Sequence, residues 1–510
     1  MSIESKTLPR SESTAVSRPH WGQALARRAL LARLEQLREG QIEWVEGERV
    51  LRFGRPTRDC PLVARLEVRD ARFYTDLALG GSMAAAEAYM AGHWRSDDLT
   101  ALLRIMARNM EVADGMDRGL AALAVPLQRL SHWLNRNTEA GSRRNIAAHY
   151  DLGNDFFRLM LDETMMYSSA IFAHDGMSLH QAQVHRLEVI CQKLKLRASD
   201  HLLEIGTGWG GLALYAAAHY GCRVTTTTIS REQYELARRR VAEAGLEDRV
   251  TVLMEDYRRL TGQFDKLVSI EMIEAIGHEY YATYFRRCAG LLKPNGLMLI
   301  QAITIADQRY EQAKQSVDFI KRYIFPGGCL PSVTAMTRII GTYTDLRLTQ
   351  LEDIGPHYAT TLSHWRDNVQ QHLGEIRALG YSDVFLRMWH YYLCYCEAGF
   401  RERTISAVHL VAARPGPAFD SIQWIREYHE DTHAFAVGLP DGRRGPGRGG
   451  DSTRHDGEGL AGAGGCAQGL GNPGPSAWLQ RFPRAQPGGL YRLSGAGQEA
   501  RILLSPGQAV

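Results

Sequence analysis

Residues 200–211 read Asp-His-Leu-Leu-Glu-Ile-Gly-Thr-Gly-Trp-Gly-Gly, and this stretch decides the fold. The apolar run that ends at Ile205 stops abruptly at Gly206 and Gly208, and an Ala- and Leu-rich helical pattern follows over residues 212–219. This order predicts a strand, a glycine turn and a helix. Glycine permits positive φ and a close approach of ligand to backbone, but a tight turn needs glycine even where nothing binds. The turn alone therefore leaves a ligand site and a plain turn equally open.

Strands and helices alternate after this turn. Apolar, β-branched runs predict strands at residues 224–229, 250–254, 264–272, 297–305 and 404–413. Helical patterns over residues 231–244 and 278–292 separate them, and a helix over 178–196 precedes the turn. Such alternation predicts an α/β fold with a doubly wound, mostly parallel sheet. Polar residues also gather just past the strand ends, where open sheets bind ligands, which favours a ligand site at the turn.

Composition excludes several classes of protein. The 510 residues carry 60 Lys and Arg against 57 Asp and Glu, and a net charge of +3 excludes a strongly basic nucleic-acid-binding protein. The eight cysteines are scattered without a Cys-x-x-Cys or a zinc-like cluster, so we expect a reduced, cytoplasmic protein with no metal site. No apolar run reaches membrane-spanning length, so any membrane contact is expected to be peripheral.

The chain divides into five predicted parts. They are a disordered N-terminus at residues 1–18, a small α+β domain at 19–120, a linker at 121–142, the α/β domain at 143–414 and a tail at 415–510. The tail is rich in Gly, Arg and Pro and shows almost no apolar periodicity, so we expect it to be disordered. A natural tail and an out-of-frame continuation of a GC-rich gene both remain open.

The small domain begins with a basic amphipathic helix over residues 21–39. Alternating residues 41–77 predict a small sheet, an Ala-rich helix follows between Gly81 and Gly92, and another helix is expected over residues 97–110, capped by Ser96 or Asp97. The arginines of the first helix can form either a solvated face or a contact with anionic lipid headgroups.

The glycine turn lacks the Gly-Lys-Ser/Thr of a nucleoside triphosphate site and departs from Gly-x-Gly-x-x-Gly. With Glu204 before it and polar residues after the next two strands, it best suits an adenosine ligand without pyrophosphate. S-adenosylmethionine is the ligand that we expect.

Six blocks of residues, in order, resemble the cyclopropane-fatty-acyl-phospholipid synthases, which include the mycolic-acid cyclopropane synthases and are S-adenosylmethionine-dependent methyltransferases. The blocks lie at residues 149–155 (His-Tyr-Asp-Leu-Gly-Asn-Asp), 167–168 (Tyr-Ser), 203–211, 228–233 (Thr-Ile-Ser-Arg-Glu-Gln), 323–332 (Tyr-Ile-Phe-Pro-Gly-Gly-Cys-Leu-Pro-Ser) and 387–389 (Arg-Met-Trp). The resemblance covers residues 143–414, and residues 20–120 more loosely. It implies a Rossmann-like class I methyltransferase sheet.

The resemblance also implies the site residues. The expected cofactor-binding residues are Tyr167, Ser168, Glu204, Gly206, Gly208, Gly210, Thr228 and Gln233, with Asp256 and Tyr257 flanking the adenine. The family holds a bicarbonate beside the sulfonium, and Glu274 and Tyr358 stand at two of its ligand positions, with Tyr358 expected just before a helix that begins near Thr360. Cys396 stands at the family's active-site cysteine.

Two departures bear on the chemistry. The chain has Ser169 where the family has cysteine, and Gln301 where the family has histidine. Both can still donate a hydrogen bond, but neither titrates near neutral pH. We therefore expect the anion's geometry to survive and its base strength, and with it the product, to change.

The implied reaction is electrophilic: a cis-alkene attacks the sulfonium methyl, and a base removes a proton from the resulting carbocation. Loss from the new methyl closes a cyclopropane, and another proton loss gives a methylene branch. The expected substrate is an unsaturated phospholipid in a membrane surface, and a homodimer is possible. The alternatives are a methylene- or methyl-branched product, a methyltransferase for a soluble small molecule, and a catalytically silent lipid-binding protein.

Overall fold

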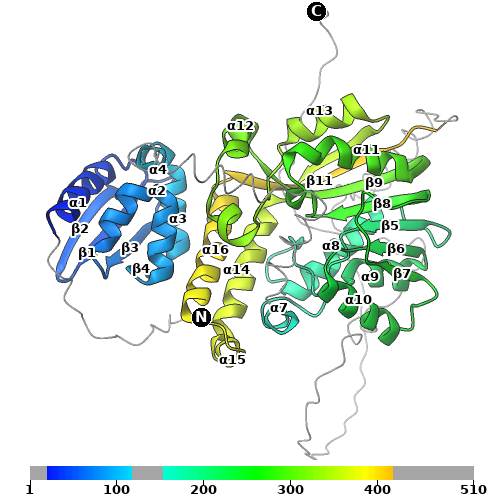
Figure 1. Cartoon of the computed structure of the whole chain (residues 1–510), viewed down its shortest axis with the longest axis horizontal. Coiled ribbons are helices and arrows are strands. Elements are labelled where there is room, and N and C mark those ends of the chain that lie inside the picture. The colour runs from blue at the N-terminus through cyan, green and yellow to red at the C-terminus, as the bar shows by residue number, and fades with distance from the viewer. Residues whose placement is uncertain (1–19, 118–152, 417–510) are drawn as a thin grey trace, which may run out of the picture.

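The structure is a computed structural model that describes residues 20–117 and 153–416, arranged as a small N-terminal domain beside a larger α/β domain (Figure 1). The predictions for residues 1–18, for the linker at 121–142 and for the tail beyond residue 416 lie outside the described residues. The block at residues 149–155 lies outside them as far as residue 152. Among the described helices, none is both long enough and apolar enough to cross a membrane.

The N-terminal domain packs helices against a four-stranded sheet of order β2-β1-β3-β4. Its elements are α1 (Trp21–Leu34), β1 (Gly40–Glu46), β2 (Arg49–Arg55), β3 (Val63–Val68), α2 (Arg72–Ala91), β4 (Trp94–Ser96), α3 (Leu99–Arg108) and α4 (Met110–Asp117). The buried rings of Trp44, Phe73 and Trp94 centre its core. The α+β prediction therefore describes this part of the chain.

Two local predictions for this domain are wrong. The sheet segment predicted to reach residue 77 ends at Val68, because residues from Arg72 onward place Phe73 and Leu77 on one buried helical face. The cap of α3 is Asp98, whose carboxylate accepts the amide N–H of Ala101 at 2.8 Å, rather than the two residues before it.

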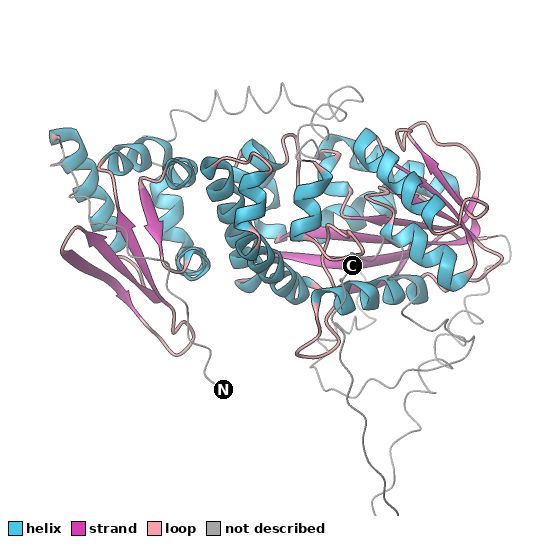
Figure 2. Ribbon diagram, turned by 90° about the horizontal axis from the view of Figure 1, so that it is seen from below, coloured by secondary structure: helices cyan, strands magenta, loops and turns pink. Residues whose placement is uncertain are grey.

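The α/β domain is built on a seven-stranded sheet of order β10-β11-β9-β8-β5-β6-β7. Its strands are β5 (His201–Ile205), β6 (Arg223–Thr227), β7 (Val250–Leu253), β8 (Phe264–Ile270), β9 (Leu292–Ile305), β10 (Arg347–Asp353) and β11 (Ile405–Ala413). The strands from β9 to β7 run parallel, and β11 and β10 add antiparallel pairs at one edge. Helices cover both faces (Figure 2), so the expected doubly wound architecture is confirmed.

The helices of this domain frame the site. They are α7 (Asn154–Met160), α8 (Leu179–Lys193), α9 (Gly211–Tyr220), α10 (Arg231–Glu243), α11 (Tyr281–Leu291), α12 (Asp307–Gln315), α13 (Val333–Tyr343), α14 (Gly355–Gln371), α15 (Leu373–Ala378) and α16 (Asp383–Arg401). Short turns lie at η2 (Ile273–Ala275), η3 (His278–Tyr280) and η4 (Ile320–Ile324). Tyr358 lies inside α14, so the helix expected to begin near Thr360 begins earlier, at Gly355.

The N-terminal domain packs against α16 through buried charges. The Glu397 carboxylate, 2% exposed, accepts the Arg366 guanidinium, which also donates to Thr100 of α3 at 2.8 Å. Tyr89 of α2 pairs with His390 of α16 at 2.9 Å. A buried carboxylate is costly without such partners, so these contacts fix α16 between the two domains. The same helix carries residues that line the site.

Candidate active site

The glycine turn leaves open backbone at the carboxyl end of β5. Gly206, Gly208 and Gly210 have φ of 103°, 50° and 86°, values that residues with a Cβ rarely adopt. No side chain or backbone atom lies within 4 Å of where a Cβ of Gly208 would stand, and Gly210 caps α9. Residues 206–209 of the turn line a cavity of about 1000 Å³ at the carboxyl end of β5, and their open backbone leaves room for a polar adenosine ligand.

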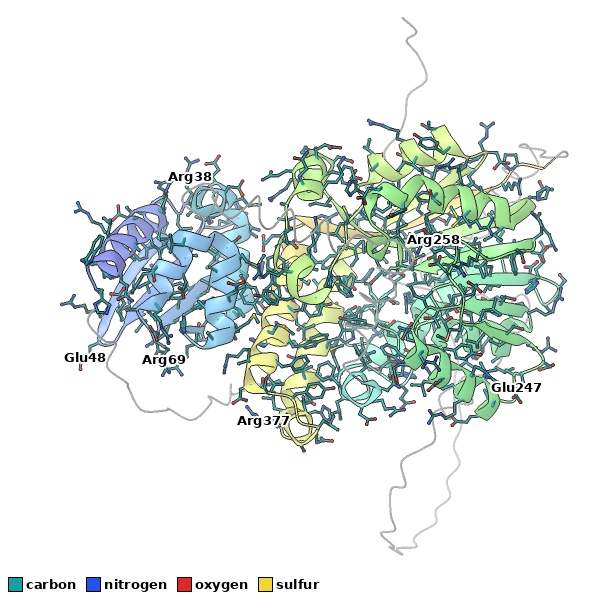
Figure 3. All side chains as sticks on the ribbon, in the orientation of Figure 1. Arg38, Glu48, Arg69, Glu247, Arg258 and Arg377 are labelled. Carbon is teal, nitrogen blue, oxygen red and sulfur yellow. The ribbon has the colours of Figure 1, made fainter. Side chains whose placement is uncertain are left out.

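The other expected cofactor residues line the same cavity, except for Gly210 behind the turn. The Thr228 hydroxyl donates to Gln233 at 2.8 Å, and the Asp256 carboxylate accepts Arg258 at 2.7 and 2.8 Å. The Tyr257 hydroxyl is buried without a hydrogen-bond partner in the described residues. Because Tyr257 lines the cavity, a ligand bound there can supply that partner. Figure 3 labels Arg258 near these strand ends.

Glu204 lies in β5, two residues before Gly206. Its carboxyl group is 2% exposed and accepts the Thr226 hydroxyl at 2.6 Å. Burial raises the pKa of Glu204 to about 8, although Thr226 and the charge of Arg186 oppose that rise.

Tyr167 and Ser168 line the same cavity. The Tyr167 hydroxyl pairs with that of Tyr392 on α16 at 2.9 Å. The Ser168 hydroxyl accepts the buried Arg186 guanidinium at 2.9 Å. Both contacts fix side chains that the sequence singled out, one from α16 and the other from α8.

The centre of the site is a carboxylate that the sequence analysis did not single out. Glu271, just past β8, accepts the Ser169 amide N–H at 3.0 Å and the Gln301 amide at 2.7 Å on one oxygen. Its other oxygen accepts the Tyr358 hydroxyl at 2.6 Å. Three expected catalytic residues therefore converge on one side-chain carboxylate. The Ser169 hydroxyl turns away and donates to the carbonyl of Ala170.

The backbone at Glu271 is strained. Its φ of 48° lies in the left-handed region, which costs a residue with a side chain about 1–3 kcal/mol and persists where surrounding structure enforces it. Burial raises the pKa of Glu271 above that of an ordinary glutamate, against the opposing effect of its hydrogen bonds and of Arg186. A carboxylate of raised basicity, held in one orientation, suits a general base.

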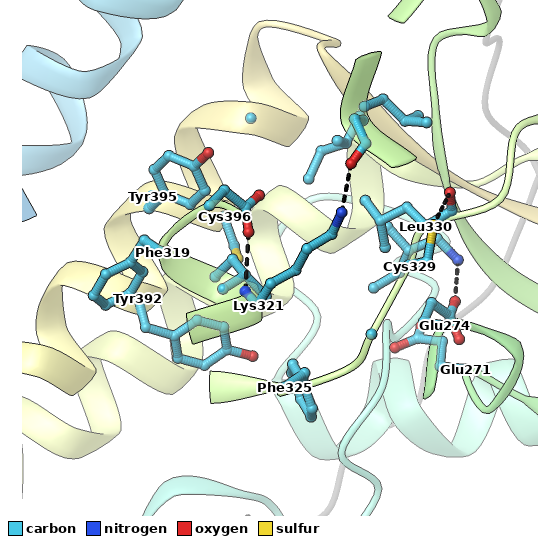
Figure 4. A pocket seen from close by; sticks show the side chains of 18 of the residues that line it. Glu271, Glu274, Phe319, Lys321, Phe325, Cys329, Leu330, Tyr392, Tyr395 and Cys396 are labelled. Carbon is cyan, nitrogen blue, oxygen red and sulfur yellow. Dashed lines mark hydrogen bonds between the residues drawn. The ribbon is translucent and has the colours of Figure 1, made fainter. Parts of the chain in front are cut away.

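Glu274 lies next to Glu271 (Figure 4). One oxygen accepts the backbone N–H of Ile303 at 2.5 Å, and the other is buried without a partner among the described residues. Burial, and then the charge of Glu271, raise the pKa of Glu274 to about 8. The two carboxyl groups are close enough for the charge of one to oppose ionisation of the other.

A hydrogen bond with His409 orients the Gln301 side chain. Its carbonyl oxygen lies 2.9 Å from Nε2 of His409, and the Nδ1 atom of this ring faces Lys193 at 2.8 Å. Burial and the charges of Lys193 and Arg186 hold the pKa of His409 well below its usual value. The ring is therefore neutral, with its proton on Nε2. It directs the Gln301 carbonyl away from Glu271 and the amide towards it.

The expected bicarbonate does not fit this arrangement. Its expected ligand Tyr358, together with Gln301 and the Ser169 N–H, already donates to Glu271, so these three donors are engaged by the protein's own carboxyl group. Cys396 lines the same cavity, and burial raises the pKa of its thiol, so the thiol is neutral.

Glu271 was missed in the sequence analysis because this residue directly follows an apolar strand and belongs to none of the matched motifs. The signal that could have identified it is an acidic side chain at the end of a strand.

The geometry agrees with the comparisons to known proteins. The profile of the mycolic acid cyclopropane synthetase family matches residues 137–410. This chain belongs to that family.

Within the family, the chain is 40% identical to the tuberculostearic acid methyltransferase UfaA1 of Mycobacterium tuberculosis, covering 66% of this chain and 80% of that protein. It is 36% identical to the cyclopropane-fatty-acyl-phospholipid synthase of Escherichia coli K12, over 69% and 88%. The structure of the mycolic acid cyclopropane synthase CmaA1 with SAH and CTAB aligns at a TM-score of 0.50 and 32% identity, over 53% of this chain and 98% of that one. The chain is thus an S-adenosylmethionine-dependent methyltransferase related to enzymes of lipid metabolism.

Proposed function

We propose that this methyltransferase moves the methyl group of S-adenosylmethionine to the cis double bond of a phospholipid acyl chain, and that Glu271 removes the proton which the carbocation loses. The observation that carries the proposal is the Glu271 carboxylate, held by three donors at the position expected for a separate anion. The cofactor, when bound at Gly206–Gly208, supplies the electrophilic methyl. Glu271 supplies the base from within the chain.

Methyl transfer breaks the sulfur–carbon bond and places a positive charge on the alkene carbon that did not receive the methyl. Ring closure with loss of a proton from the new methyl gives a cyclopropane. A hydride shift from the methyl-bearing carbon, followed by the same proton loss, gives a methylene branch. Both routes release one proton, which Glu271 accepts. Aromatic rings that line the cavity, such as Tyr392 and Phe400, stabilise the cation and exclude water.

We favour the methylene branch over the cyclopropane that the sequence put first. Glu271, whose pKa is raised by burial, stands where a separate anion was expected, and the sequence predicted a changed product if the base changed. The 40% identity to a tuberculostearic acid methyltransferase supports the same choice. A cyclopropane remains the second candidate, because the chain is also 36% identical to a cyclopropane-fatty-acyl-phospholipid synthase.

The test is to express the chain in a bacterium whose phospholipids carry cis-monounsaturated chains and to analyse the lipids. The two products have the same mass, so proton NMR must separate an exocyclic methylene from a ring. Glu271→Gln should lower turnover by about 10²–10⁴-fold, the usual contribution of a positioned base, with cofactor affinity retained. Glu274→Gln is the matched control and should keep most activity. Full activity of Glu271→Gln would refute the assigned base.

Location at a membrane surface is part of the same proposal. On α1, Trp21 and Leu25 are 87% and 64% exposed beside exposed arginines, a combination suited to a lipid interface. Arg27, however, is engaged by Glu46 at 2.7 Å and does not belong to this surface. A homodimer stays a prediction.

A further inference from the structure

One cavity of about 1000 Å³ connects both domains. It runs from Gly206 past Glu271 and along α16, and it reaches Leu77 inside the N-terminal domain. Figure 4 shows part of its wall, with Glu271 and Glu274 on one side and the rings of α16 and Phe319 on the other. The reaction centre therefore opens towards the N-terminal domain as well as towards the cofactor.

The end of the cavity inside the N-terminal domain is apolar. It is lined by Leu34, Ile42, Phe73, Leu77, Trp94 and Leu102. The one polar atom among these side chains, Nε1 of Trp94, already donates to the carbonyl of Ala85 at 2.8 Å. Trp44 also lines this end, and its Nε1 donates to Glu46 at 2.9 Å. Ser82 and Asp114 are the polar residues of the described N-terminal domain that line the cavity besides the two tryptophans. The wall formed by the six apolar side chains favours a hydrocarbon over a lipid headgroup.

Helix α2 is broken where it meets this space. Gly81 has φ 60° and ψ −146°, which is not helical, and Gly80, Ser82, Met83 and Ala85 around the break line the cavity. Protein interiors are normally packed to the density of organic crystals. A hollow beside a broken helix, continuous with a catalytic centre, therefore indicates space kept for a ligand.

We propose that the interior of the N-terminal domain receives the methyl end of the reacting acyl chain. The inference rests on the proposed function, because the occupant is the part of that chain beyond its double bond. The carboxyl end and headgroup remain outside this apolar end. The N-terminal domain thus sets how many carbons can follow the double bond, in addition to any contact with the membrane.

The test uses Ala85→Phe, which places a ring in the cavity. Leu79→Phe on the same helix is the control, since Leu79 is 58% exposed and does not line the cavity. Phospholipids are supplied in one mixed vesicle, with the cis double bond at a fixed distance from the carboxyl carbon and tails of increasing length beyond it. Mass spectrometry reports relative turnover. Ala85→Phe should disfavour the longest tail by about tenfold or more, the effect of excluding two buried methylene groups.

An unchanged tail preference in Ala85→Phe, or an equal loss for all tails, would overturn the proposal. A preference that followed the length of the unreactive second chain would overturn it too. Comparable melting temperatures and cofactor affinity must accompany the variants.

A second measurement is independent of turnover. A cis-monounsaturated fatty acid brominated at its methyl end should quench tryptophan fluorescence in the wild type, and Trp94→Phe should reduce that quenching. A fatty acid brominated near its carboxyl group should quench Trp94 far less. Equal quenching by both probes would place the chain in the opposite sense or elsewhere and refute the inference. Quenching as expected without any turnover would instead count against the proposed function alone.

Discussion

Replacing Glu271 by glycine should convert an enzyme with a built-in base into one that depends on an added anion. The φ of 48° at this position suits glycine, so the change relieves backbone strain while it removes the carboxylate. It leaves the Ser169 N–H, the Gln301 amide and the Tyr358 hydroxyl directed at a vacated space. Loss of a positioned base should cost about 10²–10⁴-fold in turnover.

In Glu271→Gly, the three donors left without an acceptor determine whether an added anion restores turnover. Each buried donor left without an acceptor costs about 1–3 kcal/mol, so a small anion that accepts all three regains a large part of that energy. Bicarbonate, formate and acetate should therefore restore turnover of Glu271→Gly in a saturable way. The wild type, whose donors are engaged, should not respond to them. Glu271→Gln, which keeps the side-chain volume, is the control and should not be rescued.

The assay is turnover of a cis-monounsaturated phospholipid in degassed buffer, with and without added anion, alongside cofactor affinity by calorimetry. High activity of Glu271→Gly without any anion would show that the proton leaves by another route. A wild type that requires bicarbonate would show that Glu271 does not replace it.

Three further predictions concern the surroundings of the base. Glu274 is neutral below its pKa of about 8, and its ionisation beside Glu271 should lower wild-type activity as pH rises through that value. Because the pKa of an ordinary glutamate is 4.5, the free energy of unfolding should fall between about pH 4.5 and 8. Glu274→Gln should flatten both pH profiles, and unchanged profiles would refute the assignment. His409→Leu removes the donor at 2.9 Å from the Gln301 carbonyl, so kcat should fall about tenfold or more with cofactor affinity unchanged, and a loss of cofactor affinity instead would indicate a structural role. Reversing the charges of Arg28 and Arg33 should weaken binding to anionic vesicles by roughly 1 kcal/mol per charge and reduce the salt dependence of that binding. Flotation at two salt concentrations measures this, and binding that responds to neither the charge reversal nor the salt would contradict the prediction.

The architecture was predictable where the sequence carries strong local signals. The glycine turn after β5 and the alternation of apolar runs with helical patterns define the parallel sheet. The edge strand β10 was missed, because residues such as Arg347, Thr349 and Glu352 give an exposed strand no apolar alternation. The break in α2 was predicted as a boundary between elements, because a single strained glycine inside a helix has the same local signature as a turn.

The site was predictable as a set of donors and not as a complete centre. Tyr358, Gln301 and Ser169 lie together as their resemblance implied, because each is fixed by its own strand, helix or loop. The acceptor between them could not be assigned from matching motifs, since Glu271 contributes through its position in space. Its strained backbone and its three donors appear only once β8, β9 and α14 are assembled.

The departures from the family pattern are consistent with one another once Glu271 is in place. Ser169 contributes through its backbone N–H, so the loss of the cysteine side chain leaves that hydrogen bond intact. Gln301 donates from a neutral amide. A histidine there could take up a proton, and its positive charge beside Glu271 would stabilise the carboxylate and weaken it as a base. Glutamine avoids that loss, while the neutral His409 fixes its orientation. The carboxylate, the amide and the imidazole behind it therefore form one hydrogen-bonded unit, and if Glu271 is the base, as proposed, the donor at position 301 does not have to titrate.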